Sequence, residues 1–328
     1  MKNRKILGCS FPLIVILSII LLVLIIYGLL SGPIGKSLLG QEFGPSWLHV
    51  ESPRPELAPG ILFHIGFLPV TNTMITAWIT IILLVLVSFI AFRQPKLVPT
   101  GIQKFMEFVY CTLLDFCISI AGEKNGRRFF PFVATIFVFI ITNSWLGLLP
   151  FYGDSLYVVG EGEKHIPLLR AANTDINIPF ALALFSWISI EVFGIRAIGF
   201  FHYLKKFFNF DKLGSGFKYL FKGKIKSAFS EIIFGAIDIF VGVLELVSEF
   251  IRLVSFTFRL FGNMTAGEVL ILVVAFLAPL VVGSLVYGLE LFFGFLQALI
   301  FAGLTVVWMT MAITPHEEEN KREEHSQI

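Results

Sequence analysis

Cysteine, charge and catalytic motifs are all scarce in this chain of 328 residues. The three cysteines, Cys9, Cys111 and Cys117, are an odd number without metal-ligand spacing, which argues against a disulfide framework. Charged residues make up 15% of the chain and the net charge is +2, so no nucleic-acid partner is indicated. The motifs H-E-x-x-H and G-x-S-x-G are absent and the six histidines are scattered, which indicates no metal, no cofactor and no membrane-embedded hydrolase.

Hydrophobic residues are correspondingly abundant in this chain. The chain is 56% hydrophobic with a mean hydropathy of +0.84, whereas a soluble domain is about 45–50% apolar. A helix needs about 20 apolar residues to cross roughly 30 Å of hydrocarbon. Four runs fit one crossing and two longer ones follow: 11–30, 74–92, 129–149, 178–201, 232–278 and 281–313. We therefore expect an all-α polytopic membrane protein with about six hydrophobic segments.

The run 232–278 is too long for one upright crossing. As a single helix it would reach roughly 70 Å, so it must tilt steeply, break, or lie partly along the membrane plane. Pro279 and Gly283 mark the turn before the last run. The sequence therefore predicts a long, tilted helical hairpin at the C-terminal end.

Two other segments need a separate interpretation. Residues 11–30 follow a charged start, as in a signal peptide, but the run is long and no A-x-A site follows, so an uncleaved transmembrane helix is favoured. In residues 102–120 apolar residues recur every three or four positions, while Lys104, Glu107, Cys111 and Asp115 occupy another face. This pattern is typical of an amphipathic helix on the membrane surface.

The basic residues predict the orientation, because cytoplasmic loops carry the excess of lysine and arginine. Most of the 25 basic residues fall on one side of the expected spans, and the outer loops carry only Lys36, Arg54, Lys164 and Arg170. Both termini should then face the cytoplasm. The expected order is an N-terminal helix (1–31), an outer loop (32–73) and a membrane domain (74–328) with a basic, lipid-anchoring inner loop (201–230) and a cytoplasmic tail (314–328).

A polar stripe follows one face of the long apolar run. On a helical wheel, seven residues fall within roughly a third of the circumference: Glu245, Ser248, Glu249, Arg252, Ser255, Arg259 and Asn263. Glu249 and Arg252 can form a structural ion pair, and Arg252 can reach towards the inner surface. Arg259 has no acidic residue three or four positions away, and an intramembrane charge of this kind indicates an ion path.

The segments "SEFIRLVSFTFRLFGNMTAGEVLI" and "LELFFGFLQALIFAGLTVVWMTMA" closely resemble subunit a of the bacterial F-type ATP synthase. The strings "ITNSWLGLLP" and "NTDINIPFALAL" echo the same family, and together the matches cover residues 74–312. This resemblance implies that Arg259 is the family's essential arginine. It also implies that Gln297 is the glutamine that packs against this arginine, and that Asn263 is the asparagine one helical turn after it. Glu268 and Glu290 line the outer half-channel, with Glu290 as a carboxylate variant of a position that is often histidine.

The resemblance also gives roles to the weaker matches. Glu245 and Ser248 match polar positions of the inner half-channel, Asn143 a polar position of the third span, and Asp175 the polar start of the next span. It implies a stator subunit that is not catalytic alone, with no cofactor, whose partners are the c-subunit ring, b-type peripheral stalk subunits, the rest of the ATP synthase and membrane lipid. The implied location is the bacterial plasma membrane.

A secondary transporter would also place arginine and glutamate inside the membrane. Such a protein is expected to show two hydropathically similar halves with interrupted helices in matching places. Here the long hairpin occurs only at the C-terminal end. The sequence therefore favours the stator subunit.

Overall fold

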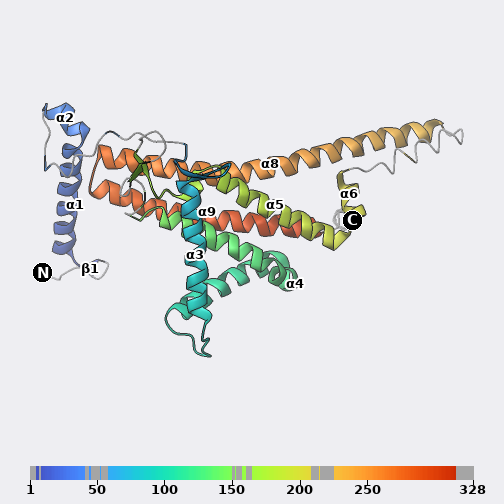
Figure 1. Cartoon of the computed structure of the whole chain (residues 1–328), viewed down its shortest axis with the longest axis horizontal. Helices are drawn as coiled ribbons and strands as arrows, with labels where there is room; N and C mark the ends of the chain where they lie inside the picture. The colour runs from blue at the N-terminus through green and yellow to red at the C-terminus, as the bar shows by residue number, and fades with distance from the viewer. Residues whose placement is uncertain are drawn as a thin grey trace. The chain divides into compact units, whose positions relative to one another are not determined.

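The computed structural model describes residues 5–6, 9–40, 44–45, 52, 58–149, 152, 157–159, 165–207, 214 and 225–314. Parts of the expected outer loop, most of the basic segment 201–230 and nearly all of the tail 314–328 lie outside these residues. Eight α-helices are described: α1 (Phe11–Ser31), α2 (Pro33–Leu39), α3 (Asn72–Phe92), α4 (Ile102–Leu146), α5 (Asn177–Ile198), α6 (Phe200–Phe207), α8 (Ile225–Leu277) and α9 (Val281–Ile313) (Figure 1). The fold is all-α, as expected for a polytopic membrane protein.

Short antiparallel hairpins account for all the strands in the described residues. They pair β1 (Lys5–Ile6) with β2 (Cys9–Ser10), β3 (Ile61–Ile65) with β4 (Leu68–Thr71), and β5 (Tyr157–Val159) with β6 (His165–Pro167). The cross-strand partners include Ile65 with Leu68 and Val158 with Ile166. A short 3-10 turn, η2 (Ala172–Thr174), precedes α5.

Five described helices are long and apolar enough to cross a membrane, or six if α1 and α2 count as one span bent by 75°. The bend between α1 and α2 falls at Gly32, and Pro33 begins α2, where a missing N–H removes no helical hydrogen bond. The number of apolar segments agrees with the expectation of about six.

The amphipathic segment and the third span are contained in α4, which is kinked at Gly122. Gly122 has φ 76° and ψ 167°, a backbone conformation that side chains disfavour, so the two helical parts meet there at an angle. In the first part Leu113 and Cys117 are buried while Asp115 is exposed. Phe105, expected on the apolar face, is 59% exposed, which leaves it free to face lipid.

Three expected boundaries were wrong. The span expected at 178–201 ends at Ile198, because Gly199 takes φ 92° and Phe200 already begins α6. Pro279 lies in the hairpin turn as expected, but Gly283 lies inside α9, and the turn residue with positive φ is Leu280 at 82°. The long helix α8 begins at Ile225, inside the segment expected as a loop, and runs unbroken for 53 residues. The sequence left three alternatives for the run 232–278: a steep tilt, a break, or a course partly along the membrane plane. The continuous helix α8 excludes the break.

The chain divides into two compact units. The first comprises Met1–Trp78, Ile141–Asp175 and Phe261–Gln297, and the second comprises Ile79–Ile140, Ile176–Leu260 and Ala298–Ile328. In the first unit, α1 packs against the hairpin turn. A Cβ at Gly28 would overlap the carbonyl oxygen of Pro279, and one at Gly32 that of Leu277, so only glycine permits this approach.

Aromatic rings and buried hydroxyls hold the second unit together. The Phe129 and Phe193 rings meet edge to face with centroids 5.1 Å apart, and Phe256 on α8 lies 4.7 Å from Phe301 on α9. The hydroxyls of Ser186 and Thr305, both fully buried, are 2.9 Å apart and join α5 to α9.

Candidate functional site

Glu268 and Glu290, the two residues expected along the outer path, belong to the first unit. The same unit holds Asn143, Asp175, Asn263 and Gln297. The residues expected along the inner path, together with Arg259, belong to the second unit: Glu245, Ser248 and Arg259.

Asn143 anchors a buried amide network at the end of α4. Its side-chain nitrogen donates to Asn173 Oδ1 at 3.2 Å, and its oxygen accepts from the backbone N–H of Ala172 at 3.3 Å. Asn173 also lies 3.5 Å from the Ser144 hydroxyl, which in turn contacts the sulfur of Met264 on α8. The network ties the η2 turn to α4 and provides uncharged groups that can hydrogen-bond water.

Asp175 is buried at the start of α5. Its Oδ2 accepts a hydrogen bond of 2.8 Å from the Thr73 hydroxyl at the start of α3, and only 3% of the residue is exposed. Asn72, next to Thr73, donates to the carbonyl of Pro167 at 3.0 Å. These bonds hold the segment before α5 against α3.

Glu268 on α8 forms a bidentate ion pair with Arg170. Arg170 Nη2 lies 3.0 Å from Glu268 Oε2, and Arg170 Nε lies 3.2 Å from Oε1, while Nη1 donates to the carbonyl of Ala58. The Arg170 side chain is 7% exposed and that of Glu268 is 32% exposed. Arg170 was expected only as a basic residue of an outer loop, and no local pattern links two residues 98 positions apart.

Glu290 on α9 lies against the residue that precedes Glu268. A Cβ at Gly267 would overlap the Glu290 carboxylate, so the absence of a side chain at Gly267 makes room for this acid. Glu290 is 5% exposed. Gln297, two turns along the same helix, is also buried, and its Nε2 has no protein partner among the described residues. Asn263 is half-buried.

Arg259 differs from the other arginines of the apolar segments. It is exposed on α8, next to Phe258, which is 56% exposed, and it makes no ion pair within the described residues. Ser248 is exposed and Glu245 is half-buried on the same helix. Arg259 and Gln297 belong to different units, so the contact expected between them remains a prediction.

Arg252 does not reach towards the surface. Its Nη1 lies 2.7 Å from Glu249 Oε2, as expected for an ion pair, but its Cζ stacks 3.5 Å from the centre of the Trp308 ring. The side chain is only 11% exposed. Arg196, in contrast, lies exposed in the last turn of α5, where a positive charge is favourable.

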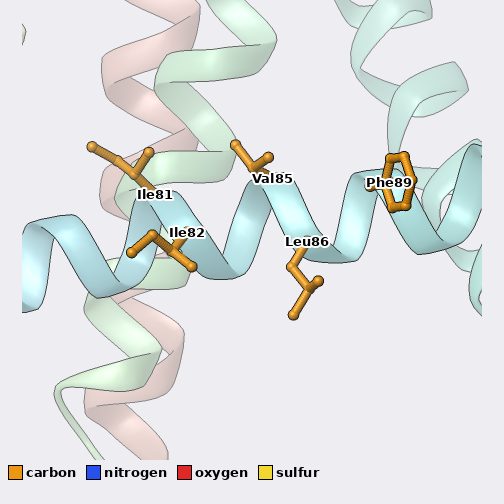
Figure 2. Close-up of a pocket in the computed structure, with 5 residues that line it drawn as sticks. All are labelled: Ile81, Ile82, Val85, Leu86 and Phe89. Carbon is orange, nitrogen blue, oxygen red and sulfur yellow. The ribbon is translucent and has the colours of Figure 1, made fainter.

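An open groove on α3 is lined only by apolar side chains, so it contains no group that could bind or transfer a proton. Figure 2 shows its lining, Ile81, Ile82, Val85, Leu86 and Phe89, all on this one helix. Leu86 is 52% exposed and Phe89 62% exposed, as expected of side chains that face lipid. Within the part of the chain that the structure describes, no group of three potential metal ligands comes together.

Long apolar helices that hold charged and hydrogen-bonding groups define a multi-pass membrane protein with a buried ionisable site. Comparison with known proteins gives the family. Residues 74–310 match the family model described as ATP synthase A chain. The chain is also 32% identical to ATP synthase subunit a of Gloeobacter violaceus over 266 residues, which cover 81% of this chain and 93% of that protein. This chain belongs to the ATP synthase A chain family.

Membership confirms the resemblance expected from the sequence and accounts for the polar groups inside apolar helices. The chain is a multi-pass membrane protein, and the processes in which it takes part are proton transport and ATP synthesis. The match begins at residue 74, after α1 and α2.

Proposed function

We propose that this chain is the stator subunit that provides two offset half-channels, one delivering protons to the carboxylates of a c-subunit ring and the other removing them. The guanidinium of Arg259, which is exposed and forms no ion pair in the part of the chain that the structure describes, carries the proposal. Arg170 and Arg252 satisfy their charges within the chain, whereas Arg259 presents its charge outwards on an apolar helix. An intramembrane charge of this kind needs a partner on another subunit, and a ring carboxylate supplies it.

The chemistry of arginine suits a barrier between the half-channels. A guanidinium is not deprotonated in a protein, so it cannot pass a proton on. A positive charge close to a carboxylate favours its ionised form. Arg259 therefore strips the proton from each arriving ring site and prevents direct flow between the half-channels. Each proton that crosses is worth about 2.3 kcal/mol per 100 mV.

The outer half-channel in this proposal runs through the first unit. Glu290, a buried acid that lies against the backbone at Gly267, exchanges protons along this path, and Glu268, paired with Arg170, follows Gly267 in the sequence of α8. Asn143, Asp175, Asn263 and Gln297 provide the hydrogen-bonding groups along the path. The inner half-channel uses Glu245 and Ser248 of the second unit.

The wider setting follows from the same proposal. The subunit is not catalytic alone and needs no cofactor. Its partners are the c-subunit ring, b-type peripheral stalk subunits and the remainder of the ATP synthase, in a bacterial plasma membrane with both termini in the cytoplasm. Helix α1 (Phe11–Ser31) is an added transmembrane helix before the family domain.

Arg259→Ala tests the proposal in the complete complex reconstituted in vesicles. The variant should lose ATP synthesis driven by an imposed potential and leak protons passively, while the detached catalytic head still hydrolyses ATP. Arg196→Ala is the matched control, because Arg196 is also an exposed arginine of an apolar helix, and it should keep synthesis near the wild-type rate. Near-normal synthesis by Arg259→Ala would refute the proposed role.

A further inference from the structure

A second buried polar cluster lies in the second unit, where four helices meet. Its members are Glu191 on α5, Tyr203 on α6, Glu249 and Arg252 on α8, and Trp308 on α9. We call these five residues the inner cluster. Tyr203 and Glu249 are each 5% exposed, so the cluster is a buried site and not a solvated patch.

Tyr203 is fixed in place by two glycines on its neighbours. A Cβ at Gly194 would overlap the Tyr203 ring, so α6 lies directly on the backbone of α5. At the other end of α6, a Cβ at Gly242 would overlap the carbonyl oxygen of Phe207, so the same short helix also lies directly on α8. Helix α6 therefore covers the cluster between α5 and α8. The Tyr203 ring rests on Gly194, one turn after Glu191 on α5, which brings the Tyr203 hydroxyl near the Glu191 carboxylate.

Tyr203 remains a neutral phenol in this site. Burial raises the pKa of its hydroxyl far above the ordinary value, and the adjacent Glu191 and Glu249 carboxylates raise this pKa further, while Arg252 lowers it only in part. A neutral phenol can donate a hydrogen bond to a carboxylate, and such a bond favours the ionised form of the acid.

The five residues carry a net charge of −1 when both glutamates are ionised, and the uptake of one proton neutralises this charge. Glu249 and Arg252 form an ion pair at 2.7 Å, and Trp308 covers the guanidinium. With both glutamates ionised, the cluster has two negative charges and one positive charge. A proton taken up on Glu191 balances them without disturbing the ion pair.

Two further donors indicate that the cluster holds water. Arg252 Nε and Trp308 Nε1 are buried without a protein partner in the part of the chain that the structure describes. Buried donors are almost always satisfied, and ordered water does so where protein groups do not. Water between these donors and the carboxylates supplies the hydrogen-bonded chain that a proton needs to enter and leave the site.

We propose that the inner cluster is a hydrated proton-exchange site, with Glu191 as the proton carrier and Tyr203 as the residue that positions it. The inference rests on the proposed function and adds a site on the side that carries the basic segment 201–230. A hydronium ion in the water chain gives a proton to the Glu191 carboxylate and becomes water, while the carboxylate becomes a carboxylic acid. Loss of that proton to another water forms hydronium again and restores the carboxylate. Tyr203 keeps its hydroxyl proton throughout.

The test uses the complete complex in membrane vesicles, with passive proton conduction measured after removal of the catalytic head. Glu191→Gln should lower conduction per assembled complex at least about tenfold, and Glu191→Asp should restore much of it. Tyr203→Phe keeps the ring on Gly194 but removes the donor, so the pH profile of conduction should differ from that of the wild type while the amount of assembled complex stays unchanged. Glu123→Gln is the control, because Glu123 is exposed on the first turn after the kink in α4 and forms an ion pair with the exposed Arg127.

Wild-type conduction and pH dependence in Glu191→Gln and Tyr203→Phe would overturn the inference. So would a loss that merely follows the amount of assembled complex, because that result indicates a structural role. Either outcome leaves the proposed function intact if Arg259→Ala loses ATP synthesis in vesicles that retain the catalytic head. Coupled synthesis in Arg259→Ala would instead refute the proposed function itself.

Discussion

Arg170 and Glu268 form a bidentate ion pair that joins the segment before α5 to α8, with a shortest distance of 3.0 Å. The arginine also donates to the carbonyl of Ala58, so three parts of the first unit meet at one side chain. The pair places a fixed positive charge beside the acid expected at the outer path. The two acids therefore have different surroundings. Glu268 forms an ion pair with Arg170, whereas the Glu290 carboxylate packs against the backbone of Gly267.

Loss of Arg170 should impair the outer path more than loss of the charge on Glu268. Arg170→Gln leaves Glu268 without its cation, which should cost about 2–3 kcal/mol in function or assembly. Glu268→Gln keeps a side chain that can still accept from Arg170. Proton conduction of both single variants and the double variant measures the coupling between the two residues. Additive effects in this cycle would show that the ion pair does not contribute to conduction.

The pairing of Arg170 with Glu268 also illustrates what the sequence could not predict. Helical periodicity is a local property, so the apolar runs, the polar stripe and the position of Arg259 could be derived from the sequence. A contact between residues 98 positions apart depends on how α8 packs against a distant loop. The family resemblance supplied roles only for positions within its motifs, and Arg170 lies just before the matched string at residue 173.

Backbone geometry was the second feature that local patterns missed. Pro279 and Gly283 were expected to mark the turn; Pro279 lies in it, but Gly283 lies inside α9, and the turn residue with positive φ is Leu280 at 82°. A non-glycine residue rarely takes this conformation, so the packing of the hairpin end must hold it there. The position of Arg252 was missed for a related reason, because stacking on Trp308 depends on the pairing of α8 with α9.

Gly267→Ala should displace Glu290. The added methyl group would overlap the Glu290 carboxylate, which must then leave its position against α8. We expect ATP-driven proton pumping to fall at least about tenfold, because a misplaced proton-transfer group loses most of its contribution. Gly288→Ala is the matched control, since a Cβ at Gly288 meets nothing within 4 Å, and it should pump normally. Equal pumping by the two alanine variants would argue against Glu290 as a carrier.

Gly28→Val should release α1 from the hairpin turn. The carbonyl oxygen of Pro279 occupies the space that the new side chain needs, and a backbone carbonyl moves less readily than a side chain. Spin labels at the exposed residues Leu24 and Leu285 can report the separation of α1 and α9. The distance distribution should broaden or shift in Gly28→Val and stay unchanged in Gly288→Val. An unchanged distribution in both would mean that the glycine contact does not fix α1.

Ser186 and Thr305 should respond unequally to loss of their hydroxyls. Thr305 Oγ1 donates to the carbonyl of Phe301 at 2.8 Å, so in the pair with Ser186 the serine must be the donor. Ser186→Ala removes that donor and leaves the bond of Thr305 to Phe301 in place. Thr305→Val keeps the shape of the side chain but leaves a fully buried serine hydroxyl without its acceptor.

Thr305→Val should therefore destabilise the packing of α5 on α9 more than Ser186→Ala does. Hydrogen bonds between membrane helices contribute about 0.6 kcal/mol on average and up to about 1.7 kcal/mol, and an orphaned buried donor adds to the loss. Thermal inactivation of the purified complex measures the difference, and the double variant Ser186→Ala with Thr305→Val should recover part of the stability lost in Thr305→Val. If Ser186→Ala proved the more harmful single change, the assignment of donor and acceptor would have to be reversed.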